Sequence, residues 1–138
     1  MATEARPGVR AAVIADVPVM AAMEGHHSAV PFLLTRGMFG GVPVEIAGGE
    51  LSDKVGKPVA DLHSHPCPEV YLLISPEPGD AAIEVEVEGE RFDLESPAVA
   101  YIPANALHRF VTRRAKPGSF CLGVLLDPAG DAAAGRDR

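Results

Sequence analysis

Short apolar runs separated by turn residues dominate this sequence and predict a succession of β-strands. The clearest run is 83–88, Ile-Glu-Val-Glu-Val-Glu, in which apolar and acidic residues alternate strictly. Because successive side chains of a strand point to opposite faces, its apolar residues should face a core and its glutamates should face water. Gly89 lies in the turn that follows, so residues 91–94 are expected to return as the second arm of a hairpin.

The other apolar runs predict more strands and one short helix. A helix is expected over residues 17–24, with Asp16 as its N-cap, Pro18 in its first turn and Gly25 at its end. Many short strands at this spacing predict a sandwich or a barrel. The further strands are expected at residues 9–14, 32–39, 42–46, 60–65, 70–74, 98–102, 107–112 and 120–126.

Composition agrees with one β-rich domain. The chain has 138 residues, 47% of them hydrophobic, with 13 prolines and 14 glycines. That length allows one domain with a real core, and the many prolines and glycines favour short strands over long helices.

The most informative polar positions are three histidines and one glutamate. His63 and His65 stand at i and i+2, so on a strand they would share one face, and Glu69 follows beyond a Pro-Cys-Pro turn. A later turn that begins at Pro103 leads to His108. Three imidazoles and one carboxylate form a mixed nitrogen and oxygen ligand set, which suits Fe(II), Mn(II), Ni(II), Cu(II) or Zn(II) and leaves coordination positions open.

These two segments resemble the two sequence motifs of the cupin family. The first motif, His-x-His followed three or four residues later by Glu, is matched by His63–Glu69, and the second, Pro-x-Gly-x-x-His, by Pro103–His108. Asn105 replaces the usual glycine, and asparagine is the non-glycine residue that best adopts positive φ. Three departures are larger. A longer turn over 75–80 stands where a glycine usually closes the first motif, Ser96-Pro97 stands where the family usually has Gly-Asp, and Thr112 stands where it often has Asn.

The resemblance implies an all-β fold, a single cupin-type antiparallel jelly-roll barrel with a short N-terminal helix or arm. The expected organisation is an N-terminal arm over 1–30, a cupin barrel over 31–127 and a disordered tail over 128–138. It also implies one divalent transition metal, with Fe(II) favoured and Mn, Ni, Cu or Zn as alternatives. The expected metal ligands are His63, His65, Glu69 and His108.

Residues around this ligand set are candidates for further roles. Glu69 and Tyr71 are the expected catalytic residues, because Tyr71 shares the inward face of the next strand; the alternative is a packed barrel aromatic. Cys67 could compete with Glu69 as the fourth ligand, although a small residue in a tight turn is the more ordinary interpretation. His26 and His27 lie in the arm, where they could fold over the barrel mouth or simply be exposed.

Charge and cysteine content limit the partners. The net charge of −7 and the lack of a basic stripe argue against nucleic acid. No apolar run approaches a membrane span, no signal peptide is apparent, and two cysteines form no disulfide framework, so we expect a cytoplasmic protein. We also expect a small-molecule substrate and a homodimer, with residues 9–14 or 32–39 packing on a partner barrel.

The leading functional hypothesis is a metal-dependent enzyme acting on a small organic molecule, most simply an Fe(II)-type dioxygenase. One alternative is a non-redox metal-dependent isomerase, cyclase or lyase of a natural-product or catabolic pathway. Another is a non-catalytic cupin that binds a small ligand. The fold cannot decide among them, because one fold hosts many functions.

Overall fold

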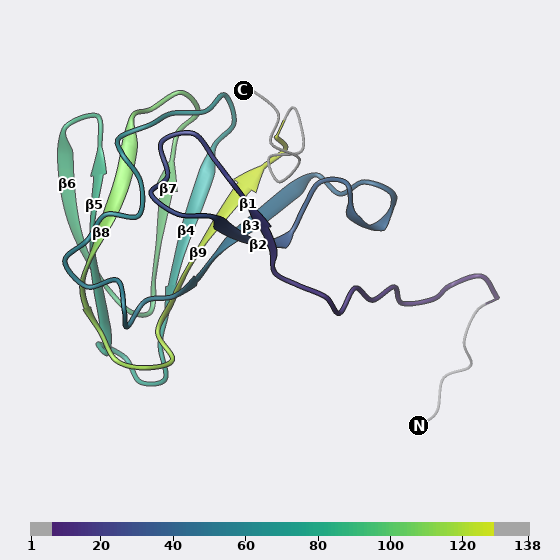
Figure 1. Ribbon diagram of the computed structural model, residues 1–138, viewed down its shortest axis with the longest axis horizontal. Coiled ribbons are helices and arrows are strands. Elements are labelled where there is room, and N and C mark those ends of the chain that lie inside the picture. Colours follow the sequence, from purple (N-terminus) through teal and green to yellow (C-terminus); the bar gives the residue numbers. More distant parts are fainter. Residues whose placement is uncertain (1–6, 129–138) are drawn as a thin grey trace.

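Two antiparallel sheets face each other in the computed structural model, which describes residues 7–128 (Figure 1). The larger sheet has the strand order β1-β2-β3-β9-β4-β7, and the smaller one has the order β6-β5-β8. The jelly-roll barrel expected from the sequence is therefore confirmed. The strands are β1 (Val19–Ala21), β2 (Val30–Leu34), β3 (Val44–Glu50), β4 (Glu69–Ile74), β5 (Ala81–Val87), β6 (Glu90–Glu95), β7 (Ala98–Ile102), β8 (His108–Ala115) and β9 (Phe120–Leu126).

The alternation in β5 defines the core as predicted. Ile83 and Val85 are 1% and 0% exposed and belong to the main apolar cluster between the sheets. On the opposite face of β5, Glu84 forms ion pairs with Arg91 and Arg113. The turn after β5 has positive φ at both Glu88 and Gly89, the conformation of a tight type I′ hairpin.

The expected helix over residues 17–24 is wrong. Val19–Ala21 instead forms β1, which pairs with β2 so that Val19 lies opposite Phe32. A helix of eight residues is marginal in water, whereas strand pairing here buries Ala21 against Phe32. The single helical element among residues 7–128 is the 3-10 turn η1 (Met38–Gly40). It ends the strand expected over 32–39, which stops at Leu34.

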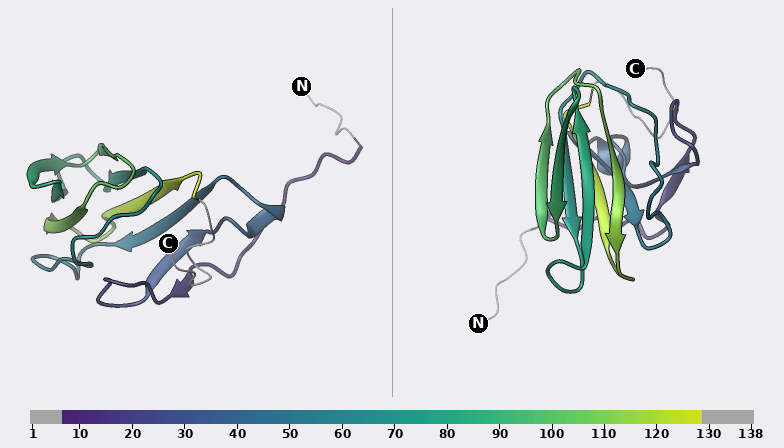
Figure 2. Two further views of the ribbon diagram at one scale, coloured as in Figure 1. Left: turned by 90° about the horizontal axis from the view of Figure 1, so that it is seen from above. Right: turned by 90° about the vertical axis from the view of Figure 1, so that its left-hand side faces the viewer.

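The segment before β1 is extended but forms no strand. The strand expected over 9–14 is therefore also wrong, and Val13 is 83% exposed. Figures 1 and 2 show this segment projecting away from the sheets. Most of the expected tail, 129–138, lies outside the described residues.

The segment with the first two histidines is not the regular strand expected over 60–65. It follows the edge of β8 through isolated bridges, Pro58 to Val111 and His63 to His108. Prolines at 58, 66 and 68 cannot donate to a ladder, which explains why regular pairing does not extend through it. Within residues 7–128, no helix has the length and apolar character needed to cross a membrane.

Candidate metal centre

Three histidines from two distant parts of the chain meet at one end of the barrel. One ligand atom from each of His63, His65 and His108 lies within 4.8 Å of the others. His108 begins β8 and is 1% exposed, and its backbone pairs with that of His63 in both directions, at 3.2 and 2.9 Å. The ring centroid of His108 lies 4.5 Å from that of His63 and 4.8 Å from that of His65.

The turn at Asn105, whose backbone is left-handed, is hydrogen-bonded to the loop of the first motif. Asn105 has φ 67°, the conformation that made its replacement of glycine acceptable at the sequence level. Its backbone N–H donates to the carbonyl oxygen of His65 at 2.8 Å. The turn that delivers His108 is thereby fixed against the loop that carries His65.

All three rings are oriented by backbone carbonyls. The Nδ1 atoms of His63, His65 and His108 lie 2.8, 3.1 and 2.8 Å from the carbonyl oxygens of Asp61, Cys67 and Ala106. Because a carbonyl oxygen only accepts, each Nδ1 carries the proton, and in a neutral ring Nε2 is left with a lone pair. A carbonyl contact of this kind at Nδ1 fixes the ring of a metal-ligating histidine so that Nε2 can face the ion.

Glu69, the first residue of β4, contacts two of these rings. Its Oε1 lies 3.1 Å from Nε2 of His65 and 3.0 Å from Nε2 of His108. Burial raises the pKa of Glu69, but the hydrogen bonds with His108 and His65 outweigh it and lower the pKa to about 2. Glu69 is therefore a carboxylate.

The hydrogen bonds to Glu69 require a proton on Nε2 of His65 and of His108 as well; with both rings neutral, the lone pairs on the two Nε2 atoms and on Oε1 would repel one another at these distances. A shared cation in place of these extra protons would make the contacts favourable. Two ligands at right angles, each about 2.1 Å from an ion, lie about 3 Å apart. The donor set and its spacing thus fit a divalent transition metal.

A glycine on β9, which the sequence analysis did not single out, makes room for this carboxylate. A Cβ on Gly123 would collide with Oε2 of Glu69. Gly123 lies opposite Tyr71 on β4 and Ala47 on β3. A glycine inside an otherwise apolar strand marks a close approach, and that signal was present at 120–126.

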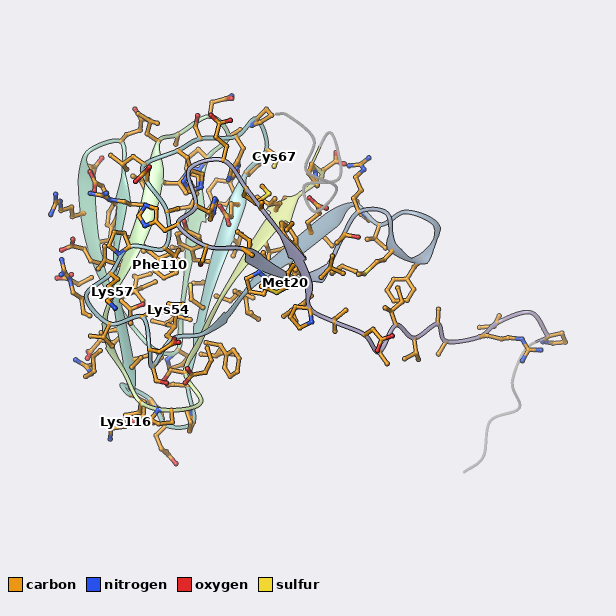
Figure 3. The ribbon with its side chains drawn as sticks, in the orientation of Figure 1. Met20, Lys54, Lys57, Cys67, Phe110 and Lys116 are labelled. Atoms are coloured by element: carbon orange, nitrogen blue, oxygen red, sulfur yellow. The ribbon has the colours of Figure 1, made fainter. Side chains whose placement is uncertain are left out.

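The two other expected site residues differ in their positions. Tyr71 is buried, lines the cavity beside Glu69 and packs edge-on against Phe110. Burial, and then the charge of Glu69, raise the pKa of Tyr71 well above its ordinary value, so its phenol stays protonated. Cys67 (labelled in Figure 3) is also buried, but its Sγ lies 3.9 Å from Nδ1 of His65, the nitrogen that faces away from the cluster.

The N-terminal arm supplies a fourth histidine beside the cluster. The ring of His26 lies 5.1 Å from that of His63, centroid to centroid, and burial lowers the pKa of His26. His27 is exposed, and its Nε2 lies 3.0 Å from Oδ1 of Asp61. The backbone N–H of Asp61 in turn donates to Gly25 at 2.8 Å, so the arm is attached to the loop that carries His63.

Two cavities meet at this cluster. One of about 330 Å³ extends between the sheets, and one of about 680 Å³ opens toward residues 22–26 of the arm and 61–65 of the loop. His26, His63 and Glu69 line both. Their volumes match those of small-molecule sites.

Comparison with solved structures agrees with this architecture. AerE from Microcystis aeruginosa superposes with a TM-score of 0.56 at 15% identity, over 78% of this chain and 44% of AerE, so the chain spans less than half of that protein. An RmlC-like cupin from Shewanella frigidimarina gives 0.53 at 11% identity, over 85% of this chain and 90% of the other. A predicted oxalate decarboxylase from Thermotoga maritima gives 0.53 at 15% identity, over 80% of this chain and 94% of the other.

The fold is that of the cupins, and the site is a three-histidine cluster that can hold a metal ion. At these identities the likeness concerns the fold alone. No family model matches the sequence, and no curated protein matches it.

Proposed function

We propose that this protein is a metal-dependent enzyme that binds a small organic substrate directly at a divalent ion held by His63, His65, His108 and Glu69. The observation that carries the proposal is the orientation of the donors. Every Nδ1 is engaged by a carbonyl oxygen, and two Nε2 atoms share one carboxylate oxygen at 3.0 and 3.1 Å. A half-buried cluster of this kind is favourable when a cation lies at its centre.

Residues beside the proposed ion can take separate roles in the reaction. A bound divalent ion would supply Lewis acidity toward a substrate oxygen and, if it were iron, electrons for oxygen chemistry. Glu69, as a carboxylate, lowers the net charge of the site and can accept a proton. Tyr71, as a protonated phenol lining the same cavity, can donate a hydrogen bond to the substrate.

We place an Fe(II)-type dioxygenase first, because a set of three histidines and one carboxylate leaves positions for a chelating substrate and for O₂. A non-redox isomerase, cyclase or lyase is the second candidate. The pairing of a carboxylate with a protonated phenol at one cavity favours it, since such reactions need a base and an acid. Neither cysteine forms a disulfide, which supports the cytoplasmic location that forms part of this proposal.

Metal analysis and oxygen uptake together test these candidates. Protein purified anaerobically is analysed for metal, loaded with iron and incubated with candidate metabolites while oxygen and product mass are followed. Product with matching oxygen uptake supports the dioxygenase, and product without it supports the non-redox enzyme. Saturable binding without product across a broad panel would overturn both and favour a ligand-binding protein.

Substitution of Glu69 by glutamine is expected to reduce the rate far more than the metal content. The amide keeps an oxygen near the two imidazoles but loses the charge and the capacity to take a proton, a role worth about a hundredfold or more in rate. The matched control is Cys67→Ser, which changes a thiol on the far side of His65 and should leave the rate nearly unchanged. Turnover and metal content are measured on the same preparations. Loss of activity in Cys67→Ser alone would mean that the fourth ligand has been misassigned.

We also propose that the chain forms a homodimer. Val9, Val13, Met20 and Phe39 are all largely exposed in the arm and the turn before β3. Apolar side chains on such segments are stabilised when a partner barrel covers them. Light scattering at micromolar concentration should give twice the chain mass, and Val13→Asp should lower it. A wild-type monomer would contradict the proposal.

A further inference from the structure

The cavity of about 330 Å³ has an unusually small-residue wall next to the histidine cluster. The inward-facing residues of the larger sheet form rows across β3, β9 and β4. One row is Ala47, Gly123 and Tyr71, and the next begins with Gly49 and Cys121. All five line the cavity. The space therefore exists because β3 and β9 place small side chains where larger ones would fill the barrel.

Polar groups gather at one end of this cavity. His63 and Glu69 line it there, and Tyr71 lies in the adjacent row. The hydroxyl of Tyr71 makes no hydrogen bond to any other residue within 7–128, so it is a donor that a ligand in the cavity can reach. An oxygen-bearing group placed at this end would meet the metal site and the phenol together.

The rest of the cavity offers mainly apolar contacts. Met20 of β1 and Phe110 of β8, both labelled in Figure 3, line it together with the buried Leu51. Away from the histidine cluster, the charged residues that line it already have partners within the chain. These are Glu50 with Ser52 and Gly118, Lys54 with Asp53, and Arg109 with Glu86. The two cationic residues, Lys54 and Arg109, are ion-paired, so an anionic group in this part of the cavity would find no unpaired countercharge.

We propose that the cavity binds the uncharged alkyl or aryl tail of a substrate whose chelating oxygen head lies at the histidine cluster, and that Gly49 and Ala47 limit the size of that tail. The inference rests on the proposed function and names its substrate class: a small amphiphile with two neighbouring oxygens at one end. Of these two positions, Gly49 is the better one at which to test the limit on tail size. Its backbone lies outside the positive-φ region, and a Cβ built on it meets nothing closer than Pro31 Cγ at 3.8 Å, so a side chain can grow there without strain.

Hydroxamic acids of increasing chain length are suitable probes, because their head is a two-oxygen chelator and stays constant along the series. The full chain is loaded with Co(II), its metal content is measured, and binding is followed by the visible absorption of cobalt and by calorimetry. Affinity should rise about fourfold per methylene from acetohydroxamate to hexanohydroxamate until the cavity is full. A probe of the same length that ends in a carboxylate should bind more weakly than hexanohydroxamate.

Substitutions in the cavity wall test where the tail binds. Gly49→Val should reduce hexanohydroxamate affinity at least tenfold and leave acetohydroxamate affinity unchanged, because the added methyls occupy tail space and not the head site. Ala47→Val serves as the second variant if the first does not fold. The matched control is Val124→Leu, which adds a methylene on the outer face of β9 outside both cavities and should leave the whole series unchanged.

The outcomes separate this inference from the proposed function. A protein that takes up no cobalt overturns the proposed function and this inference with it. A cobalt-loaded protein whose affinity is independent of tail length, or whose Gly49→Val variant weakens acetohydroxamate equally, overturns the tail site alone. Tighter binding of the carboxylate-ended probe would overturn the uncharged tail.

Discussion

Replacing His108 with alanine is expected to abolish metal binding while the barrel stays folded. His108 is the most buried of the three histidines, its Nδ1 is held by Ala106, and its Nε2 lies 3.0 Å from Glu69. Loss of an outer-shell partner costs about 10 to 100-fold in metal affinity, so loss of a ligand should cost more than about a hundredfold. The ligands lie on separate segments of a barrel whose main apolar cluster does not include His108, so folding should not depend on the ion.

Elemental analysis after metal loading measures the bound metal, and circular dichroism shows whether the barrel stays folded. His27→Ala is the matched control, because His27 is an exposed histidine whose pair with Asp61 lies at the surface and adds little stability. The control should keep the wild-type metal content. A folded His108→Ala variant with full metal content would mean that His108 is not a ligand.

Adding a single methyl at Gly123 is expected to disrupt the same site from the opposite strand. The Cβ of alanine would collide with Oε2 of Glu69, so the carboxylate has to shift, and its contacts with the rings of His65 and His108 are weakened or lost. Because Glu69 is one of the four proposed ligands, we expect metal affinity to fall by more than the about 10- to 100-fold that loss of an orienting partner costs, that is, by more than about a hundredfold if the carboxylate no longer reaches the ion. Metal affinity is measured by competition with a chelator of known strength.

Gly49→Ala is the matched control for this effect on metal affinity, since it adds the same methyl to β3 with no atom closer than 3.8 Å. It should bind metal as the wild type does. The double variant Glu69→Ala/Gly123→Ala adds a second check: once the carboxylate is gone, the methyl at 123 should have little further effect. Unchanged metal affinity in Gly123→Ala would show that Glu69 is not needed in the site.

The strands could be predicted where the local pattern of apolar and polar residues agrees with the strand pairing in the structure. The alternation of β5 and the Gly89 turn predicted both arms of the β5–β6 hairpin, and the run at 120–126 became β9 with the same bounds. Residues 17–24 and 9–14 were misassigned, because cap residues and short apolar runs do not specify which partner a segment finds. β1 exists because the edge of β2 was available to it.

The candidate site divides in a similar way. His63, His65, Glu69 and His108 could be selected from their spacing; the structure brings the three histidines together and places Glu69 against His65 and His108. The strand expected at 60–65 does not exist, yet its histidines still converge. Their rings are aimed by carbonyl contacts and by the bridge to β8, not by the alternation of a regular strand.

By itself, the sequence determined the residue types of the candidate metal site, the β-rich class and the inward face of strands such as β5. These properties depend on residues only a few positions apart in the sequence, so the spacing of apolar and polar residues predicts them directly. The tertiary structure alone decided that Gly123 makes room for Glu69, that His26 lies beside His63 and that Ala47 and Gly49 leave a cavity next to Tyr71. Each of those relations joins residues from strands or loops far apart in the chain, so it arises only when β3, β9, β4 and the arm pack around one interior.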